Sequence, residues 1–394
     1  MIRTSCRFGF VVAIATLLAL VSVAETQSKA CKLATNIVMT GQWASMGIGI
    51  YNSFKLAIDQ ATARGDFKDM KVEIVYGDNA ADTAQAVGLA TRHGQDPEIV
   101  GALCCWISGI GIATHPTYNR YGLPVILAGS NDSRSSRPLH NSKVVFRNSP
   151  YDLINMKMAA TYIRASKFNR IYLLSDTWPF GRTQVQYLQK FLTEMGHGAA
   201  ILGYDTITPG EKDFSPILTK IKPLNVDLLY FAGMVVEYAL IRQQMLKLGF
   251  TVPLMGSGGL FSETYLKIAG PAADGTLATY WGLPLEMYPE GRGLQFERDY
   301  KAAGFKDHYE TFGPPAYIAG QVFAQAIKRA GCDRQKVLKE LQTGEFDTIL
   351  GPRFRFDENG MPEFKAIAVY RAEQGQWKMI DVTDPQATRF EKTR

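Results

Sequence analysis

Residues 33–76 of the 394-residue chain read LATNIVMTGQWASMGIGIYNSFKLAIDQATARGDFKDMKVEIVY, and the spacing of their apolar residues changes twice. Residues 33–39 are strand-like. Tyr51, Phe54 and Ile58 then recur at helical spacing, and residues 72–76 are strand-like again. This succession predicts a strand–helix–strand unit with parallel strands.

The same alternation continues along most of the chain. Residues 82–90 have a helical pattern, and the further predicted strands are 99–103, 123–127, 171–174, 227–231 and 252–255. We therefore predict an α/β fold of two doubly wound lobes with mainly parallel sheets. Near the end, residues 364–370 and 377–380 flank the turn-like residues 373–376, which predicts a hairpin.

The first 24 residues have the features of an export signal. Arg3 and Arg7 precede the apolar run 8–21, and residues 22–24, Ser-Val-Ala, suit a signal peptidase. We expect a cleaved signal peptide over 1–24 and a mature chain that begins near Glu25. The alternative is a retained membrane anchor, because the apolar run approaches the length that spans a bilayer.

Four cysteines remain after the signal: Cys31, Cys104, Cys105 and Cys332. An exported protein matures in an oxidising compartment, so one or two disulfides are expected, with their connectivity open. The adjacent pair suggests burial or oxidation in preference to a catalytic nucleophile.

Charge and motifs argue against nucleic-acid binding and catalysis. The formal charge of +6 is spread along the chain without a basic run. The histidines show no metal-site spacing, and no base and nucleophile are paired, so no metal, cofactor or catalytic residue is expected and an exported enzyme is the less favoured class. Gly47 and Gly49 begin a glycine-rich turn, but Asn52 stands where a dinucleotide site has its third glycine.

Seven segments, in order, carry a family resemblance that covers nearly the whole mature chain: 40–58, 122–126, 180–181, 210–215, 227–233, 268–275 and 349–352. They resemble the leucine/isoleucine/valine-binding family of periplasmic solute receptors. The resemblance implies two lobes that close on a ligand by hinge motion. It also implies a periplasmic, monomeric protein that delivers its ligand to an ABC permease in the inner membrane, or, as an alternative, docks on a sensor.

The resemblance further implies three crossings between the lobes, near 147–150, 276–279 and 350–354. Lobe one would then comprise 25–147 plus 278–350, and lobe two 148–277 plus 351–394.

Ser108 and the turn of Gly129, Ser130 and Asn131 match the positions that hold a ligand carboxylate in the family. Hydroxyl and backbone N–H donors suit an anion. Ser108 is also a natural first residue for the helix predicted to follow it, and the two roles are compatible.

Three further positions are expected to line the ligand cleft. Met46 and Phe180 match places where the family usually has ring-bearing side chains. Trp106 resembles a tryptophan of the amide- and urea-binding branch, so a short amide or urea receptor is an alternative function. Alternatively, Trp106 only packs in the core.

Gly258 departs from the family pattern. Amino-acid-binding members carry an acidic residue there, which pairs with the ammonium group of the ligand. A buried ammonium without a partner costs several kcal/mol. Either Glu237 or Asp176 replaces the missing carboxylate, or the ligand is a small apolar or aromatic acid without an amino group. An alternative interpretation of Glu237 is that it is an acidic residue at a helix N-terminus.

Overall fold

The computed structural model describes the chain apart from residues 2–29, 69, 133, 135–140, 364–366 and 383–394. The predicted signal peptide therefore lies outside the described residues, except for Met1. Two large sheets organise the described part: a five-stranded first sheet of order β2-β1-β3-β4-β5 and a seven-stranded second sheet of order β14-β13-β10-β9-β8-β6-β7.

The strands of the first sheet are β1 (Ala30–Asn36), β2 (Lys71–Val75), β3 (Ile99–Cys104), β4 (Val125–Leu127) and β5 (Val145–Arg147), all parallel. The helices of this half are α1 (Ala44–Ala63), α2 (Thr83–Gln95), α3 (Ser108–Tyr121), α10 (Arg292–Ala302), α11 (Gly313–Ala330) and α12 (Arg334–Thr343). A small antiparallel pair, β11 (Phe346–Thr348) and β12 (Gly351–Phe354), follows α12.

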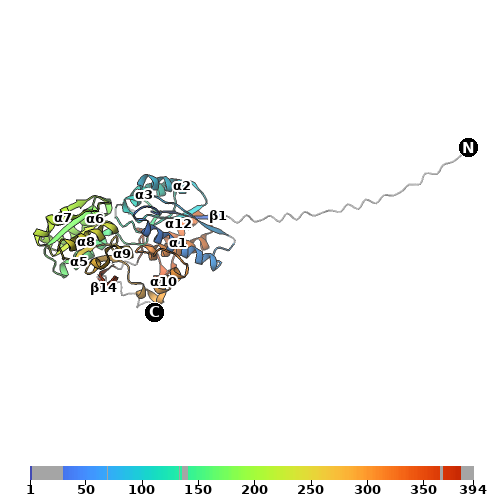
Figure 1. Ribbon diagram of the computed structural model, residues 1–394. Coiled ribbons are helices and arrows are strands. Elements are labelled where there is room, and N and C mark those ends of the chain that lie inside the picture. Colours follow the sequence, from blue (N-terminus) through green and yellow to red (C-terminus); the bar gives the residue numbers. More distant parts are fainter. Residues whose placement is uncertain (2–29, 69, 133, 135–140, 364–366, 383–394) are drawn as a thin grey trace.

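The second sheet contains β6 (Ile171–Asp176), β7 (Ile201–Ile207), β8 (Leu228–Ala232), β9 (Leu254–Gly256), β10 (Leu277–Trp281), β13 (Ile367–Glu373) and β14 (Gln376–Val382). Its helices are α5 (Asp152–Ala165), α6 (Pro179–Glu194), α7 (Ser215–Ile221), α8 (Val235–Lys247) and α9 (Glu263–Ala269). Figure 1 shows the two halves as neighbouring lobes, with α5 to α8 in one and α1 to α3 and α12 in the other.

Burial explains the order of the strands. Every residue of β3, β6 and β8 is buried, as expected of parallel strands covered by helices on both faces. The edge strand β7 alternates between half-buried and exposed residues until its buried last residue, Ile207. Separate apolar clusters line the two faces of the second sheet, one beneath α8 and α9 and the other beneath α5 and α6.

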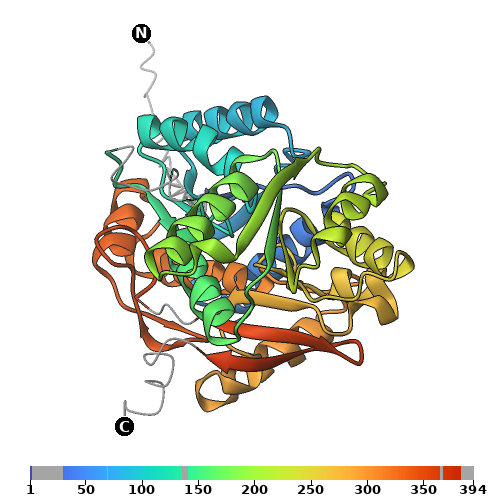
Figure 2. The ribbon, with the colours of Figure 1, turned by 90° about the vertical axis from the view of Figure 1, so that its left-hand side faces the viewer.

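The predicted α/β fold with mainly parallel sheets is confirmed. The predicted terminal hairpin is also present, since β13 and β14 pair antiparallel and form the red ribbon in Figure 2; its predicted residues 364–366 lie outside the described part. The first strand begins and ends three residues earlier than predicted, and β5, β7 and β10 occupy stretches for which no strand was predicted.

The boundaries of the lobes remain a proposal. The chain leaves the first sheet at the end of β5 and enters the second lobe at α5. Because β10 pairs with β9 and β13, Leu277–Trp281 is part of the second sheet. Because β12 pairs with β11, which follows α12, residues up to Phe354 stay with the first lobe. The strand pairing therefore favours crossings after Trp281 and after Phe354.

Four cysteines of the described residues form two disulfides. Cys31 in β1 joins Cys332 between α11 and α12, with 5.3 Å between their Cα atoms. Cys104 joins its neighbour Cys105 at the end of β3, and both are buried. The expectation that the adjacent cysteines are buried or oxidised is confirmed.

Candidate functional site

Two buried polar side chains lie between the end of β3 and the start of α3. Cys105 adopts a positive φ of 39° after the strand, and α3 begins three residues later at Ser108. Trp106 Nε1 and Ser108 Oγ are buried and have no hydrogen-bond partner among the described residues. Unpaired buried donors are costly, so this end of α3, with its free N–H groups, is suited to an acceptor-rich ligand.

The turn after β4 lies against the first turns of α3. A Cβ on Gly111 of α3 would lie 2.2 Å from Ser130 Oγ, so the Ser130 hydroxyl points at this helix. That hydroxyl is also buried without a partner in the described part of the chain. The Ser130 carbonyl accepts a hydrogen bond of 2.9 Å from Arg147 Nη1, which fixes the turn. The structure thus places the Ser108 and Ser130 side chains at the first turn of α3.

Asn131 and Gly129 contact aromatic side chains instead of open space. In the orientation that satisfies its neighbours, the Asn131 amide donates to the Gly129 carbonyl at 3.0 Å and accepts from Trp281 Nε1 at 3.1 Å. A Cβ on Gly129 would lie 2.7 Å from the ring of Phe312. Only glycine therefore leaves room for Phe312 at this turn.

A row of rings connects the predicted positions. Trp106 stacks on Phe312 at 6.3 Å between centroids, and Phe312 stacks on Trp281 at 6.0 Å. Trp281 packs on Tyr280 at 5.0 Å, and a Cβ on Gly258 would lie 3.9 Å from Tyr280. Phe312, Trp281 and Tyr280 were not predicted as site residues, because no local pattern distinguishes them from core aromatics.

Met46 and Phe180 lie at the starts of helices in different lobes. Met46 is buried in the first turn of α1. Phe180, in the first turn of α6, is half-buried and packs against an apolar cluster that includes side chains of both lobes. A Cβ on Gly259 would lie 3.8 Å from the Phe180 ring.

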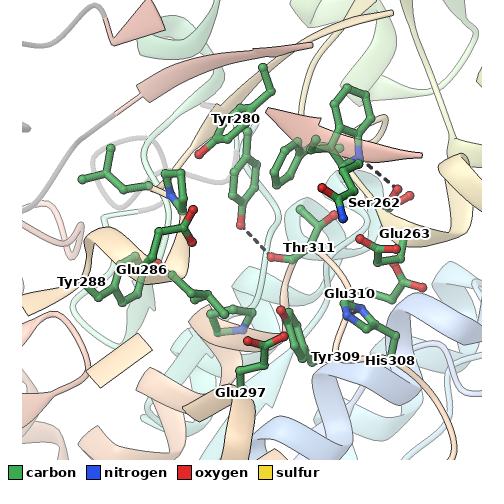
Figure 3. Close-up of a pocket in the computed structure, with 18 of the residues that line it drawn as sticks. Ser262, Glu263, Tyr280, Glu286, Tyr288, Glu297, His308, Tyr309, Glu310 and Thr311 are labelled. Carbon is green, nitrogen blue, oxygen red and sulfur yellow. Dashed lines mark hydrogen bonds between the residues drawn. The ribbon is translucent and has the colours of Figure 1, made fainter. Parts of the chain in front are cut away.

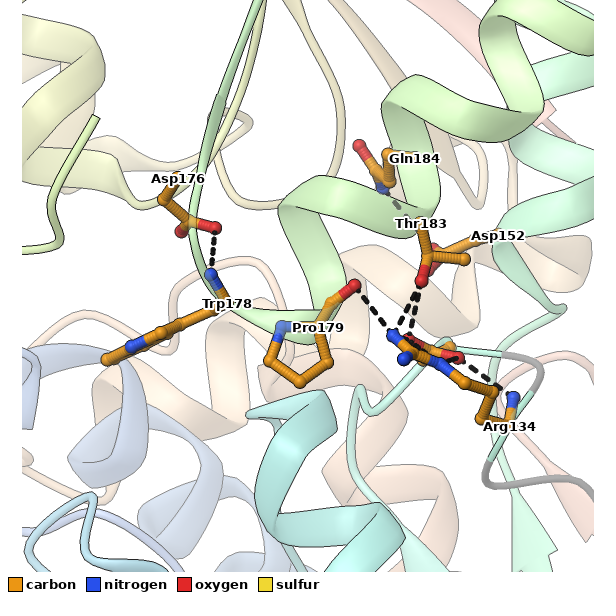
Figure 4. Close-up of polar contacts among 8 residues, drawn as sticks. Arg134, Asp152, Asp176, Trp178, Pro179, Thr183 and Gln184 are labelled. Carbon is orange, nitrogen blue, oxygen red and sulfur yellow. Dashed lines mark hydrogen bonds and ion pairs between the residues drawn. The ribbon is translucent and has the colours of Figure 1, made fainter. Parts of the chain in front are cut away.

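A polar bridge joins the lobes beside these helix ends (Figure 4). Arg134 Nη2 donates to the Pro179 carbonyl at 3.0 Å and to Thr183 Oγ1 at 2.7 Å, and it pairs with Asp132 at 2.6 Å. Thr183 in turn donates to Asp132 at 3.0 Å. Asp152 lies nearby: burial raises its pKa to about 7, and the Asp132 carboxylate adds to the rise.

Aromatic side chains also pack across the interface between the lobes. Trp43 beside α1 meets Trp178 beside α6 edge to face, with 4.9 Å between ring centroids. These contacts and the polar bridge describe lobes in contact around the start of α6.

Comparisons with known proteins agree on the family. The family model described as "Periplasmic binding protein" matches residues 31–376. A Leu/Ile/Val-binding protein homolog of Brucella abortus is 29% identical over 365 residues, which cover 91% of this chain and 95% of the relative.

The chain belongs to the leucine/isoleucine/valine-binding family of periplasmic binding proteins.

Solved structures with the same fold bind different solutes. A leucine-binding protein from Thermotoga maritima matches this periplasmic binding protein with a TM-score of 0.80 at 22% identity, covering 90% of this chain and 99% of its own. A solute-binding protein from R. palustris in complex with benzoate matches with a TM-score of 0.76 at 18% identity, covering 91% and 97%. At these identities the likeness establishes the fold alone.

In this binding protein, the two carboxylates considered as replacements for a side chain at Gly258 are neighbours in lobe two. Glu237 lies in the first turn of α8, as expected of an acidic residue at a helix N-terminus. Its Oε1 accepts a hydrogen bond from the Gly210 N–H at 2.8 Å. Asp176 Oδ1 accepts from the Trp178 N–H at 3.0 Å. Burial, with a smaller contribution from Glu237, raises the pKa of Asp176 to about 7. The second oxygen of each carboxylate has no partner among the described residues.

The described residues contain no group of three or more metal-ligating side chains that could hold an ion. No described helix is both long and apolar enough to cross a membrane.

Proposed function

We propose that this periplasmic binding protein serves an ABC importer and carries a small carboxylate that lacks an α-amino group and has an aromatic or branched apolar body. The observation that supports this most is Gly258. The position expected to hold the counter-ion of an ammonium group has no side chain, and its neighbour is the ring of Tyr280.

The donors at the other end of the row of rings suit a carboxylate. Ser108 Oγ, Ser130 Oγ and Trp106 Nε1 are buried and unpaired among the described residues. Each would gain a hydrogen bond to a charged acceptor, which contributes about 1.5–3 kcal/mol. The stacked rings of Trp106, Phe312 and Trp281 supply an apolar wall beside them.

The mechanism requires no bond breaking. Donors of lobe one and Phe180 of lobe two would contact the ligand together only when the lobes are closed. A ligand with this differential affinity shifts the population toward the closed form, and we propose that the permease recognises that form. The Arg134 bridge contributes to the same closed state.

The test compares leucine with 4-methyl-2-oxopentanoate, its keto acid, by calorimetry on the mature protein. The two ligands share the branched body and the carboxylate and differ at the α-position. We expect the keto acid or benzoate to bind at least about a hundredfold more tightly than leucine, because an unpaired ammonium costs several kcal/mol. Leucine binding that equals or exceeds keto acid binding would refute the ligand assignment and leave the family role intact.

A short amide or urea is the second candidate ligand. Trp106 Nε1 and Ser108 Oγ are unpaired donors two residues apart in sequence, and they can bind a neutral carbonyl as well as an anion. Acetamide and urea would then raise the melting temperature at millimolar concentration, whereas the carboxylate proposal expects benzoate to do so and benzamide to fail.

We also propose export to the periplasm, monomeric action and delivery to an inner-membrane permease. The family supports these roles. Adjacent genes for permease and ATPase subunits would favour import, and an adjacent receptor kinase gene would favour the sensor alternative.

A further inference from the structure

A cavity of about 420 Å³ shares Tyr280 with the row of rings but is lined by none of the predicted ligand positions. None of Met46, Trp106, Ser108, Gly129–Asn131, Phe180, Glu237 or Gly258 lines it. Its residues come from both sides of the hinge region: the start of α9 and the β13–β14 hairpin on one side, and α10 and the segment before α11 on the other.

The charge of this cavity is opposite to that expected of an acid-binding site. Four glutamates line it, and no lysine or arginine does. Figure 3 shows Glu286 on one side and Glu263 and Glu310 across from it, with Glu297 below. Glu297 pairs with Lys301 at 2.9 Å, whereas Glu263 and Glu286 form no ion pair with any residue that the structure describes.

Lys267 opposes the rise in the pKa of Glu263 and of Glu310 without cancelling it, so the neighbouring ionisable groups do not fully neutralise the cavity. Burial, followed by repulsion from Lys267, lowers the pKa of His308 to about 4, so its ring is uncharged at neutral pH. Burial raises the pKa of Glu310, and burial together with Glu310 raises the pKa of Glu263. Desolvated carboxylates of this kind are stabilised by a cation.

Aromatic rings form the rest of the wall. Phe261 stacks on Tyr280 at 4.6 Å and packs against Tyr370 at 4.3 Å and Trp377 at 5.2 Å between centroids. The faces of such rings attract organic cations. These rings are held in place by one another, so the wall is formed before any ligand arrives.

A buried hydroxyl provides an independent indication of a ligand. Thr311 lines the cavity and is only 6% exposed, yet its Oγ1 has no hydrogen-bond partner among the described residues. Its backbone carbonyl is already occupied by the Tyr280 hydroxyl at 2.6 Å, as Figure 3 shows. An unpaired buried hydroxyl that lines a cavity requires a partner.

We propose that this cavity binds a small organic ammonium ion, held by cation–π contacts with the aromatic wall and by the carboxylates of Glu263, Glu286 and Glu310. The site would therefore take a ligand of opposite charge to the acid proposed for the cleft.

The experiment is a calorimetric titration of the mature protein with choline and with 3,3-dimethylbutan-1-ol, the uncharged isostere of choline. Choline should bind saturably and at least about tenfold more tightly than the alcohol, because the isostere keeps the shape and loses the charge. Equal affinities, or no saturable choline binding up to about 20 mM, would overturn the proposal.

Variants locate the site. Glu263→Gln and Glu286→Gln should each weaken choline binding about five- to tenfold, and Thr311→Val should weaken it less. Glu194→Gln, which removes an exposed glutamate paired with Lys190 on α6, should leave choline binding unchanged.

Ser108→Ala separates the cavity from the cleft. It should abolish neither choline binding nor its dependence on Glu263. Loss of choline binding in Ser108→Ala would mean that the cation occupies the cleft, and it would overturn the proposal of a separate cation site.

Discussion

Replacement of Gly258 by aspartate should reverse the ligand preference of this protein. A Cβ at this position meets only the ring of Tyr280 within 4 Å, at the ordinary contact distance of 3.9 Å, and the backbone does not require a positive φ. The structure therefore accommodates the new side chain without displacing backbone. Asparagine is the matched control, because it has nearly the same shape and no charge.

The magnitude follows from Coulomb's law. A carboxylate placed about 6 Å from the ligand carboxylate, at an effective dielectric constant of about 20, is repelled by about 3 kcal/mol. This corresponds to about a hundredfold loss in affinity for a keto acid or benzoate. Leucine would suffer the same repulsion at its carboxylate and gain an ion pair at its ammonium group, so its affinity should hold or rise.

Calorimetry of Gly258→Asp and Gly258→Asn with leucine and with 4-methyl-2-oxopentanoate gives four affinities. We expect the ratio of leucine to keto acid affinity to rise at least about a hundredfold in the aspartate variant relative to asparagine. An equal change for both ligands would refute the reasoning, because it would show that position 258 does not face the α-substituent of the ligand.

Four further predictions concern other parts of the molecule. Ser108→Ala should weaken acid binding about tenfold to a hundredfold by calorimetry with an unchanged melting temperature in the absence of ligand; unchanged affinity would place the ligand elsewhere. Asp152, with a pKa of about 7 in the fold and about 4 when unfolded, takes up a proton on folding, so its contribution to stability is full below about pH 4 and is lost as pH rises through 7. Asp152→Asn should therefore reduce the fall in urea-measured stability between pH 4 and 7 by up to about 1.4 kcal/mol per pH unit, and an unchanged slope would contradict the raised pKa. Cys332→Ser removes the disulfide to Cys31, which closes a loop of 301 residues. The variant should have a free energy of unfolding lower by up to about 5 kcal/mol. Equal stability of the oxidised wild type and the variant would contradict this. Asp176→Asn should leave keto acid affinity unchanged, and a selective loss of leucine affinity would identify Asp176 as the counter-ion.

The fold was predictable because its strongest signals are local. The strands β3, β6 and β8 are buried throughout, so each appears in the sequence as a mainly apolar stretch. β5 and β9 are only three residues long, and β7 alternates because it lies at an edge, so these strands carried weaker signals. The disulfide partner of Cys31 could not be predicted, because nothing local to Cys31 indicates a residue 301 positions away.

The candidate site was predictable only at the ends of strands. Ser108 and Ser130 follow β3 and β4, where the topology of a parallel sheet places ligand contacts. The rings of Tyr280, Trp281 and Phe312 come from β10 and from the segment before α11, and they meet Trp106 only after the chain has crossed between lobes. No spacing of residues in the sequence predicts that these rings pack together.

The carboxylates of lobe two also argue against a simple replacement of the missing acid. Asp176 and Glu237 each use one oxygen to hold a backbone N–H, at Trp178 and at Gly210, and so they stabilise the loops around the starts of α6 and α8. With a pKa of about 7, Asp176 is ionised in only about half of the molecules at neutral pH. A counter-ion for ammonium must carry its charge when the ligand arrives, and a ligand that first had to displace the proton of Asp176 would bind less tightly as the pH falls. An acid without an amino group requires neither carboxylate and leaves both loops as they are.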